Sequence, residues 1–450
     1  MDISKQNLAE HDQTIVSIKM HNIYAGYALV LTAAACVAGS IGSRILMLGI
    51  TALFALLIFK PEYLLGPIMF FTIFDDFLLV ASNASASRFL TIFFILGAAG
   101  AILKRGNVKT VTLYFLLLIA VAVTLSFYTT YGGTSLPISY VLNVLLAIAM
   151  LNMAATFPER MSKVLYAYAV LTLAYIYYLL VKNGFDSLVE GSRMTIGEDV
   201  NSNALAMGLA MAMGVLVNHL IIYKKHAFVD ILLIVANLVA LFLTGSRTAL
   251  IASVVTAFLC YFINAQDRRS KNKAFLLIIL STALLIVIYR SLEKFFPVLM
   301  ERFTVENVEA SGGSGRMDVW KAYFSNLFPK YWFIGMGFDP SNFYYGISIL
   351  NTEAHGAHNI IVEILSRTGI VGMILYTGCL VGFFGATGKK LRTNKAVLLP
   401  IAMVITTLIN GIGENILTGR FLWFGIGLGY MLLNTNSQED KTGSEGTHNG

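Results

Sequence analysis

Three arginines stand where apolar stretches of the sequence begin or end, and their side chains suit an anionic ligand. Arg193 precedes Asn201-Ser202-Asn203, Arg247 lies within Thr244-Gly245-Ser246-Arg247-Thr248, and Arg316 follows the glycine-rich run 311–315. A guanidinium offers a planar fork of donors that matches phosphate oxygens. Glycine-rich backbone and helix N-termini would add N–H donors toward the same charge. The three arginines therefore predict a site for a phosphate or pyrophosphate group.

A histidine stands at a similar position further along the chain. His358 lies within His355-Gly356-Ala357-His358-Asn359, directly before an apolar stretch, and Glu363 follows it by about a turn and a half of helix. Imidazole exchanges a proton near neutral pH and can act as a general base. Glu363 could orient His358 or pair with an arginine. Histidine and arginines together favour displacement of a phosphate or pyrophosphate leaving group at a membrane surface.

Each of these residues also has a purely structural interpretation. An arginine at the end of a membrane span is most often an interfacial anchor, and Arg316 could only hold its own loop in place. His358 could cap a helix or bond a neighbouring carbonyl. Trp320 could stack on a sugar, as could Tyr331, Trp332 and Phe333, but aromatic residues also gather at membrane interfaces. From the residue types alone, both interpretations stay open.

Composition determines the class of protein that carries these residues. The chain has 450 residues, of which 57% are hydrophobic and 13% charged, and it contains 38 glycines and 8 prolines. Soluble domains carry about 25% charged residues. The apolar residues occur in repeated blocks long enough to cross about 30 Å of hydrocarbon. The sequence therefore predicts an all-α polytopic membrane protein with twelve to fourteen transmembrane helices and excludes a soluble enzyme.

The apolar blocks divide the chain into five parts. We expect a cytoplasmic N-terminal segment over residues 1–22, eleven spans over 23–290, a long external loop with catalytic residues over 291–357, C-terminal spans over 358–434 and a disordered cytoplasmic tail over 435–450. A loop of that length is long enough for short helices of its own. The expected spans are 24–40, 45–59, 62–80, 89–103, 111–128, 137–154, 162–182, 203–223, 227–243, 248–264, 274–290, 358–386, 396–411 and 420–434.

Basic residues determine the expected orientation. Fifteen of them fall in five short loops that alternate with loops holding only Arg193, Arg247 and Arg420. Positive charge collects on the cytoplasmic side of membrane proteins. We therefore expect the loops that are poor in basic residues, and the long loop, to face outward. The net charge of +7 then requires no nucleic-acid partner. The basic loops contain Lys104, Arg105, Lys109, Arg160, Lys163, Lys224, Lys225, Arg268, Arg269, Lys271, Lys273, Lys389, Lys390, Arg392 and Lys395.

Other charged residues and the cysteines have weaker functional interpretations. Asp75 and Asp76 fall in the third expected span, where carboxylates are costly and usually functional, or they mark its end. Glu414 and Arg420 flank the last outward turn and are expected to pair with each other. The three cysteines are far apart within apolar stretches and show no metal-ligand spacing or disulfide pattern. No internal repeat typical of transporters is evident.

The order of short motifs over about residues 190–385 resembles that of a known superfamily. The motifs are Asn-x-Asn at 201–203, Gly-Ser-Arg-Thr-Ala-Leu at 245–250, Gly-Arg-Met-Asp-Val-Trp at 315–320, Phe-Ile-Gly-Met-Gly-Phe at 333–338, His-Asn at 358–359 and Gly-Ile-Val-Gly at 369–372. This ordered set, with the long loop in place, is similar to the O-antigen ligase and Wzy-type O-antigen and exopolysaccharide polymerase superfamily. The first six spans contribute only their hydropathy to the resemblance.

The resemblance implies a GT-C-like, metal-independent glycosyltransferase without a cofactor, in the cytoplasmic (inner) membrane with its active site facing the periplasm. The donor would be an undecaprenyl-pyrophosphate-linked oligosaccharide. Arg247 and Arg316 match the family's arginines that would hold the pyrophosphate, and His358 matches the histidine that would deprotonate the acceptor hydroxyl. Arg193 and Asn203 match a less distinctive stretch and are expected, with Trp320 and Glu363, to bind substrate. Membrane lipids and a chain-length regulator are further expected partners.

The reaction's acceptor is left open by the sequence. A polymerase would add the chain to another lipid-linked repeat, whereas an O-antigen ligase would add it to lipid A core. The stretch from Arg193 to Asn203 looks more like the exopolysaccharide polymerases, which favours the polymerase. A transporter or flippase of lipid-linked sugars, whose arginines would bind pyrophosphate without chemistry, is the third alternative.

Overall fold

The protein is a bundle of helices with one short hairpin. The computed structural model describes residues 3–75, 77–81, 84–105, 108–128, 130–132, 135–154, 158–195, 201–223, 226–265, 268–310, 316–350 and 356–434. Within these ranges the strands are β1 (Leu79–Ala81) and β2 (Ala84–Ser85), which pair antiparallel. All other regular elements there are helices, as the sequence predicts.

The first half of the described chain contains eight α-helices joined partly by two short 3₁₀ helices, η1 and η2. Their bounds are α1 (Ile3–Ser40), α2 (Arg44–Leu53), η1 (Phe54–Phe59), η2 (Pro61–Leu64), α3 (Leu65–Ile73), α4 (Ala86–Arg105), α5 (Val111–Ser126), α6 (Ile138–Leu151), α7 (Pro158–Asn183) and α8 (Asp186–Val189).

The second half continues with long helices separated by a group of short ones. Their bounds are α9 (Ser202–Tyr223), α10 (Ala227–Leu243), α11 (Arg247–Asn264), α12 (Arg268–Phe295), α13 (Pro297–Met300), η3 (Glu301–Phe303), α14 (Val305–Ala310), α15 (Arg316–Ala322), η4 (Tyr323–Leu327), α16 (Phe328–Tyr331), α17 (Pro340–Ser348), α18 (Ile360–Lys390), η5 (Lys395–Val397), α19 (Leu398–Asn410) and α20 (Arg420–Leu433).

Several of these helices fit a membrane. Among the described residues, six helices are long and apolar enough to cross it, and they lie within α1, α4, α7, α9, α11 and α18. Six shorter apolar helical stretches of 10–17 residues accompany them. The chain is therefore an all-α, multi-pass membrane protein.

Two predicted boundaries differ from the observed ones. The expected span 62–80 is wrong beyond Ile73, where α3 ends and the chain turns into the β1–β2 hairpin. Asp75 thus lies just after a helix rather than inside one, and Asp76 lies outside the described residues. At the N-terminus, α1 starts at Ile3 and runs through the segment expected to precede the first span, because no glycine or proline interrupts residues 3–25. The tail expected over 435–450 also lies outside the described residues.

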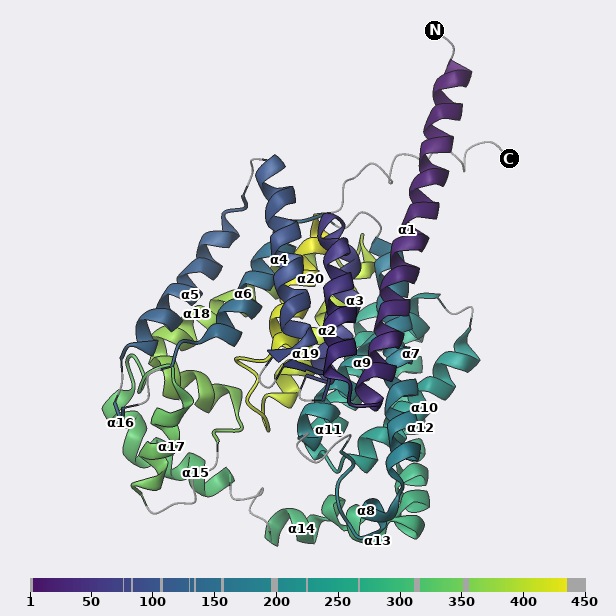
Figure 1. Cartoon of the computed structure of the whole chain (residues 1–450). Coiled ribbons are helices and arrows are strands. Elements are labelled where there is room, and N and C mark those ends of the chain that lie inside the picture. Colours follow the sequence, from purple (N-terminus) through teal and green to yellow (C-terminus); the bar gives the residue numbers. More distant parts are fainter. Residues whose placement is uncertain are drawn as a thin grey trace.

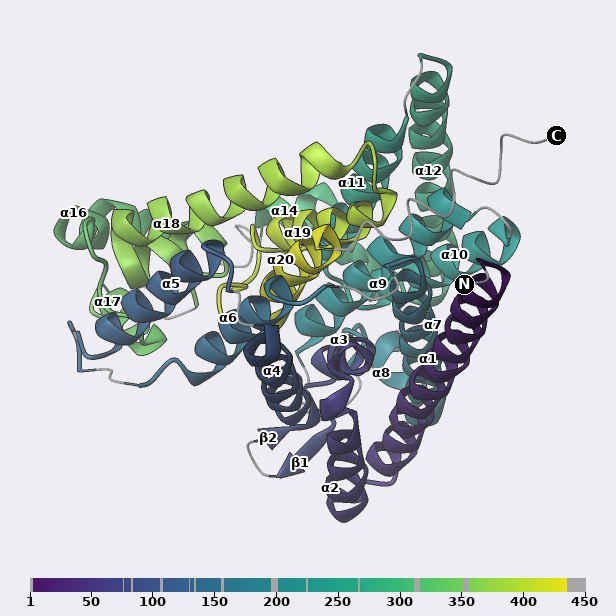
Figure 2. The same ribbon diagram turned by 90° about the horizontal axis from the view of Figure 1, so that it is seen from above.

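Helix α9 forms the centre of the bundle. It is the most enclosed of the six candidate spans, and α7, α10, α11 and α19 pack around it. A second apolar core joins α5 and α6 to α18, α19 and α20. Viewed from above, α18 and α5 extend to one side of the bundle and α1 lies along the other, next to α7 (Figure 2). The bundle therefore offers its interior helices as a rigid base for the connecting turns.

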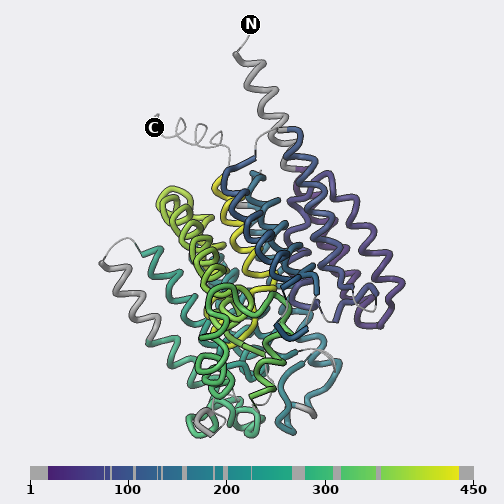
Figure 3. Tube along the Cα trace, turned by 90° about the vertical axis from the view of Figure 1, so that its left-hand side faces the viewer, coloured from purple at the N-terminus to yellow at the C-terminus, as the bar shows by residue number. Residues whose placement is uncertain are grey.

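The segment between α12 and α18 gathers at one end of the bundle. In Figure 1, α13, α14 and α15 lie at the bottom, whereas α1 starts and α4 ends at the top. The side view in Figure 3 shows the same separation, with the green residues of this segment opposite the N-terminal end. The segment has a small apolar core of its own around Tyr323 and Phe343, which packs on the first turns of α18. The prediction of short helices in this loop is confirmed.

A break in α18 anchors this segment. Gly369 interrupts the helix with φ +60°, and a Cβ at this position would lie 2.3 Å from the carbonyl oxygen of Phe333. The N–H of Ile370 donates to the carbonyl of Trp332 (2.8 Å), and the N–H of Met336 donates to the carbonyl of Ser366 (2.7 Å). The motif at 333–338 is thus hydrogen-bonded to the interrupted helix, and only glycine permits the close approach at 369.

Candidate functional site

A cavity of about 250 Å³ opens at the end of the bundle that carries the α12–α18 segment. It lies between the turn from α10 to α11, the start of α15 and the turn after α19. Four arginines line it, and none of the described lining residues is acidic. The lining consists of Arg193, Asn203, Gly245, Ser246, Arg247, Thr248, Arg302, Arg316, Met317, Trp320, Ile412 and Gly413.

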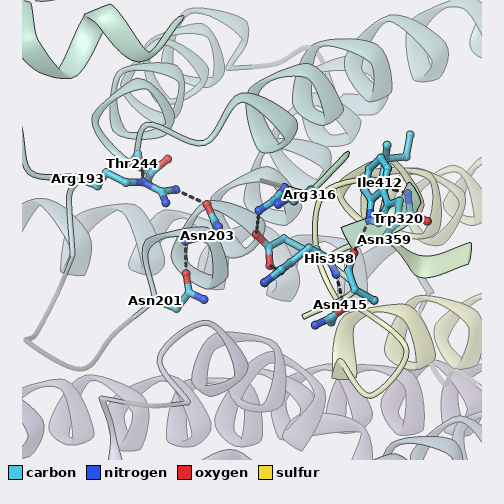
Figure 4. A network of polar contacts seen from close by, with 12 residues as sticks. Arg193, Asn201, Asn203, Thr244, Arg316, Trp320, His358, Asn359, Ile412 and Asn415 are labelled. Atoms are coloured by element: carbon cyan, nitrogen blue, oxygen red, sulfur yellow. Dashed lines mark hydrogen bonds and ion pairs between the residues drawn. The ribbon is translucent and has the colours of Figure 1, made fainter. Parts of the chain in front are cut away.

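Arg193 is fixed from two sides. Its Nε donates to the carbonyl oxygen of Thr244 (2.7 Å), and an Nη donates to Oδ1 of Asn203, as Figure 4 shows. The N–H of Met194 donates to the carbonyl of Leu243 (2.8 Å), which ties the segment that carries Arg193 to the end of α10. Asn201 in turn accepts from the N–H of Asn203 (2.8 Å) at the start of α9. These contacts place the Arg193 guanidinium at the cavity wall.

The turn from α10 to α11 places Arg247 beside a second arginine. Gly245 adopts φ +63°, and a Cβ there would lie 3.2 Å from both Cδ and Nε of Arg302. Glycine is the residue that takes this conformation without strain and leaves room for a close neighbour. Ser246 is the N-cap of α11, and Arg247 is the first residue of that helix. The Gly-Ser-Arg motif thus brings a turn, an arginine and space for Arg302 to one place.

Arg316 meets a carboxylate from the other end of the chain. As the first residue of α15, it lies with an Nη 3.4 Å from Oε1 of Glu414. Gly413 gives it room, because a Cβ at that position would lie 3.0 Å from Nη1 of Arg316 and 2.5 Å from Thr248. The turn after α19 is therefore shaped around this arginine.

His358 shares the same carboxylate. Its Nδ1 lies 3.3 Å from Oε2 of Glu414, and its backbone N–H donates to Oδ1 of Asn415 (2.9 Å). His358 has φ +41°, the only positive φ of a non-glycine residue in the described chain. Trp320 donates from its indole to the carbonyl of Ala357 (2.7 Å), holding the residue before it. With Nδ1–H turned to Glu414, the lone pair of Nε2 can accept a proton.

Electrostatics in the cavity favour an anion. Arg247, Arg302 and Arg316 each bury one guanidinium nitrogen that has no hydrogen-bond partner among the described residues. Burial, together with repulsion from Arg302, Arg316 and Arg247, lowers the pKa of Arg193 to about 10, and the charge of Glu414 opposes this shift. Arg193 still carries its charge at pH 7. Mutually repelling, partly buried guanidiniums gain most from a ligand that brings negative charge.

The predicted residues divide into a group that meets and one that does not. The structure brings Arg193, Asn203, Arg247, Arg316 and Trp320 to one cavity, and places His358 next to it through Glu414. The glycine-rich run 311–315 and His355 lie outside the described residues.

Glu363 is not among the described residues that line the cavity. It is 1% exposed, pairs with Arg367 (3.0 Å) and accepts from the N–H of Leu417 (3.1 Å). It pairs with an arginine, which was one of the two predicted options, and its carboxylate ties α18 to the turn before α20. A role in binding substrate stays a prediction.

The expected pair of Glu414 and Arg420 is wrong. Glu414 contacts Arg316 and His358, whereas Arg420 is 6% exposed and lies 3.7 Å from Asp75. Arg420 also donates to Asn143 (3.1 Å) and Thr72 (2.9 Å). Short sequence separation suggested the pair, but α20 turns Arg420 inward and the preceding turn directs Glu414 toward the cavity.

Sequence reasoning missed two residues of the site. Arg302 lies in the long loop without a glycine-rich or helix-start signal, and Glu414 was assigned another partner. Glu414 contacts His358, the predicted base, which lies 56 residues earlier in the chain. Counting every arginine of the outward loops would have found Arg302.

Part of the chain matches a known protein family. Residues 232–377 match the family model described as O-antigen ligase. No curated protein matches the chain. The matched segment contains Arg247, Arg302, Arg316, Trp320 and His358, and it lies inside the region of resemblance at 190–385.

Residues outside the matched segment also line the cavity. Arg193 and Asn203 precede residue 232, and Ile412 and Gly413 follow residue 377, as does Glu414, the partner of Arg316. The family is one of ligases and polymerases with glycosyltransferase-like activity. Arg193 and Glu414, which lie beside the arginines of the matched segment, therefore come from before and after it in the chain.

Proposed function

We propose that this protein is a glycosyltransferase that moves a glycan from undecaprenyl pyrophosphate to an acceptor hydroxyl at the outer face of the cytoplasmic membrane. The proposal depends on one observation above all. Four arginines line a single cavity, and one of them shares a carboxylate with His358.

The arginines suit the leaving group of this reaction. A pyrophosphate diester carries its negative charge on oxygens that guanidinium forks bind well, and it gains charge as the glycosidic bond breaks. Arg247, Arg302 and Arg316 line the cavity, and each has a guanidinium nitrogen without a hydrogen-bond partner among the described residues. Arg193, held by Thr244 and Asn203, supplies a fourth positive charge from the rim.

His358 suits the acceptor. Nε2 would take the proton of the acceptor hydroxyl while its oxygen forms a bond to the anomeric carbon of the donor sugar. The bond from that carbon to the phosphate oxygen breaks, and undecaprenyl pyrophosphate leaves with the electron pair. Glu414 would keep the proton of His358 on Nδ1 and balance the charge that develops on the ring. Arginines supply the charge stabilisation, so the proposed reaction proceeds without a metal ion and continues in EDTA.

Among acceptors, we propose a lipid-linked repeat, as for a Wzy-type polymerase. The stretch from Arg193 to Asn203, which resembles the exopolysaccharide polymerases, supports this choice. Both of its named side chains line the cavity and bond to each other. Lipid A core as the productive acceptor would instead identify an O-antigen ligase.

The test uses purified full-length protein with a labelled glycan on undecaprenyl pyrophosphate. We expect the glycan to leave the lipid, with one undecaprenyl pyrophosphate released for each bond formed. Separate reactions receive lipid-linked repeats or lipid A core as acceptor. In vesicles, movement of the donor across the bilayer with its linkage intact, without release, would overturn the enzyme in favour of a flippase.

A further inference from the structure

A second cavity lies between α1 and α7, at the end of the bundle opposite to the arginines. Its volume is about 350 Å³, and its described lining contains three basic side chains and no acidic one. It is lined by His21, Asn22, Ala25, Gly26 and Leu29 of α1 and by Arg160, Lys163, Val164, Ala167 and Tyr168 of α7. Arg160 is the third residue of α7, which ends at Asn183, so it lies roughly 35 Å from the far end of that helix at 1.5 Å per residue.

The two helices present matched faces to this cavity. The lining residues recur at intervals of three and four in each helix, which places them on one side of it. The helices run in the same direction. Thr32 bonds to the hydroxyl of Tyr168, and Ser40, eight residues on, contacts the hydroxyl of Tyr175 (3.2 Å). Both faces therefore begin at the same end of the cavity.

Polarity changes along the cavity in the same sense on both helices. His21, Arg160 and Lys163 lie at the end of the cavity where its lining begins on both helices. The hydroxyl of Tyr63 lies 2.8 Å from Nδ1 of His21. The Lys163 ammonium lies over the ring of Tyr223, 5.3 Å from its centroid.

Further along, the walls consist of small and apolar residues. Ala25, Gly26 and Leu29 face Val164 and Ala167 there. Gly26 is exposed, and a Cβ built on it would meet no atom within 4 Å. The cavity is thus basic at one end and apolar at the other. A free anion would need only the basic end.

We propose that this cavity binds an anionic phospholipid. Its phosphate would lie against Arg160 and Lys163 with His21 beside them, and one acyl chain would run along the apolar walls past Gly26. Basic pockets between helix ends on the cytoplasmic side are suited to anionic headgroups. The site is separate from the arginine cavity, and it does not depend on the transfer reaction.

Native mass spectrometry of the full-length protein in detergent, mixed with phosphatidylglycerol or phosphatidylcholine, tests this proposal. We expect retention of phosphatidylglycerol, and the double variant Arg160→Gln/Lys163→Gln should lower its affinity at least about tenfold. Lys389→Gln/Lys390→Gln removes the same charge from the exposed end of α18 and should change it less than twofold. Equal retention by both double variants, or equal loss, would overturn the site.

A second variant leaves the charges untouched. Gly26→Leu fills the open space beside the apolar walls, and it should lower phosphatidylglycerol binding at least about fivefold while leucine strengthens the helix. Gly100→Leu in α4 also meets no neighbour within 4 Å and is the matched control. Unchanged lipid binding in Gly26→Leu would remove the acyl chain from the cavity.

Inorganic phosphate distinguishes the two sources of a phosphate group. Millimolar phosphate should not displace the lipid, because it cannot use the apolar walls. If phosphate alone displaced phosphatidylglycerol completely and Gly26→Leu left phosphate binding intact, the ligand would be a free anion and the lipid proposal would be wrong.

Discussion

Two imidazole–carboxylate pairs lie at opposite ends of this protein. His358 and Glu414 lie 3.3 Å apart, with side chains 29% and 14% exposed, beside the arginine cavity. His219 of α9 and Asp230 of α10 lie 3.0 Å apart, with side chains 10% and 0% exposed. The same chemical pair thus occurs once in an accessible place and once in a closed one.

The surroundings give each pair a different role. The ring of Tyr166 stacks on His219 with centroids 3.7 Å apart, and its hydroxyl donates to Asp230 (2.7 Å), so the inner pair is covered and satisfied. Glu414 instead divides its oxygens between His358 and Arg316, and the His358 side chain stays 29% exposed. A histidine bonded to a carboxylate is therefore no sign of catalysis unless substrate can reach its second nitrogen.

The largest expected effect separates the two histidines. His358→Ala should lower glycan transfer by roughly 10³-fold, because it removes the proposed general base. Its melting temperature in detergent should stay close to that of the unchanged protein. Turnover near the original value would exclude His358 as the base.

His219→Ala should show the reverse pattern. Removing one partner from a buried pair leaves Asp230 uncompensated, which costs about 3 kcal/mol of stability. We expect a lower melting temperature and lower yield, with turnover per folded molecule within about twofold of the original. A large loss of turnover in well-folded protein would mean that the inner pair takes part in the reaction.

Glu414→Gln examines the carboxylate that the two outer residues share. The change keeps the size of the side chain and removes its charge, so we expect transfer to fall by roughly 10²-fold as His358 and Arg316 lose their alignment. Glu293→Gln, which disturbs the exposed pair with Arg290, is the control. Equal effects of the two substitutions would contradict the assigned role.

Arg302→Gln tests the arginine that motif reasoning missed. Loss of one charged donor to the diphosphate should raise KM for the lipid-linked donor about tenfold, with a smaller change in kcat. Arg290→Gln removes an arginine whose side chain is 70% exposed and should leave KM unchanged. If the two variants behaved alike, Arg302 would lie outside the binding site.

Gly413→Ala should have the smallest effect. The added methyl group would press on Thr248 and on Arg316, and we expect roughly a threefold loss of transfer from the displaced guanidinium. Gly100→Ala introduces a methyl group into open space and should have no effect. A neutral Gly413→Ala variant would show that the Arg316 position tolerates movement.

Much of the fold was predictable because hydrophobic length is a local property. Each apolar block specifies a helix by its own residues, and most predicted spans coincide with observed helices to within a few positions. The main exception is the third predicted span, 62–80. The apolar run Phe77-Leu78-Leu79-Val80-Ala81 follows soon after Ile73, so hydropathy did not reveal the end of α3 there.

The candidate site was only partly predictable. Arg193, Arg247, Arg316 and His358 stood out because each lies beside a turn or at the start of an apolar stretch. Arg302 had no such marker, and Glu414 was assigned to Arg420, its nearest arginine in the chain. Side chains that meet across two helices leave no trace in spacing along one of them.

The sequence by itself determined a multi-pass helical membrane protein, the alternation of basic and arginine-poor turns, and the residue types available for chemistry. Only the tertiary structure decided that four of the arginines line one cavity and that Glu414 joins Arg316 to His358. It also decided that the ring of Tyr166 stacks on His219. The physical reason is range: burial in lipid acts on each segment separately, whereas hydrogen bonds and ion pairs select partners by distance in space.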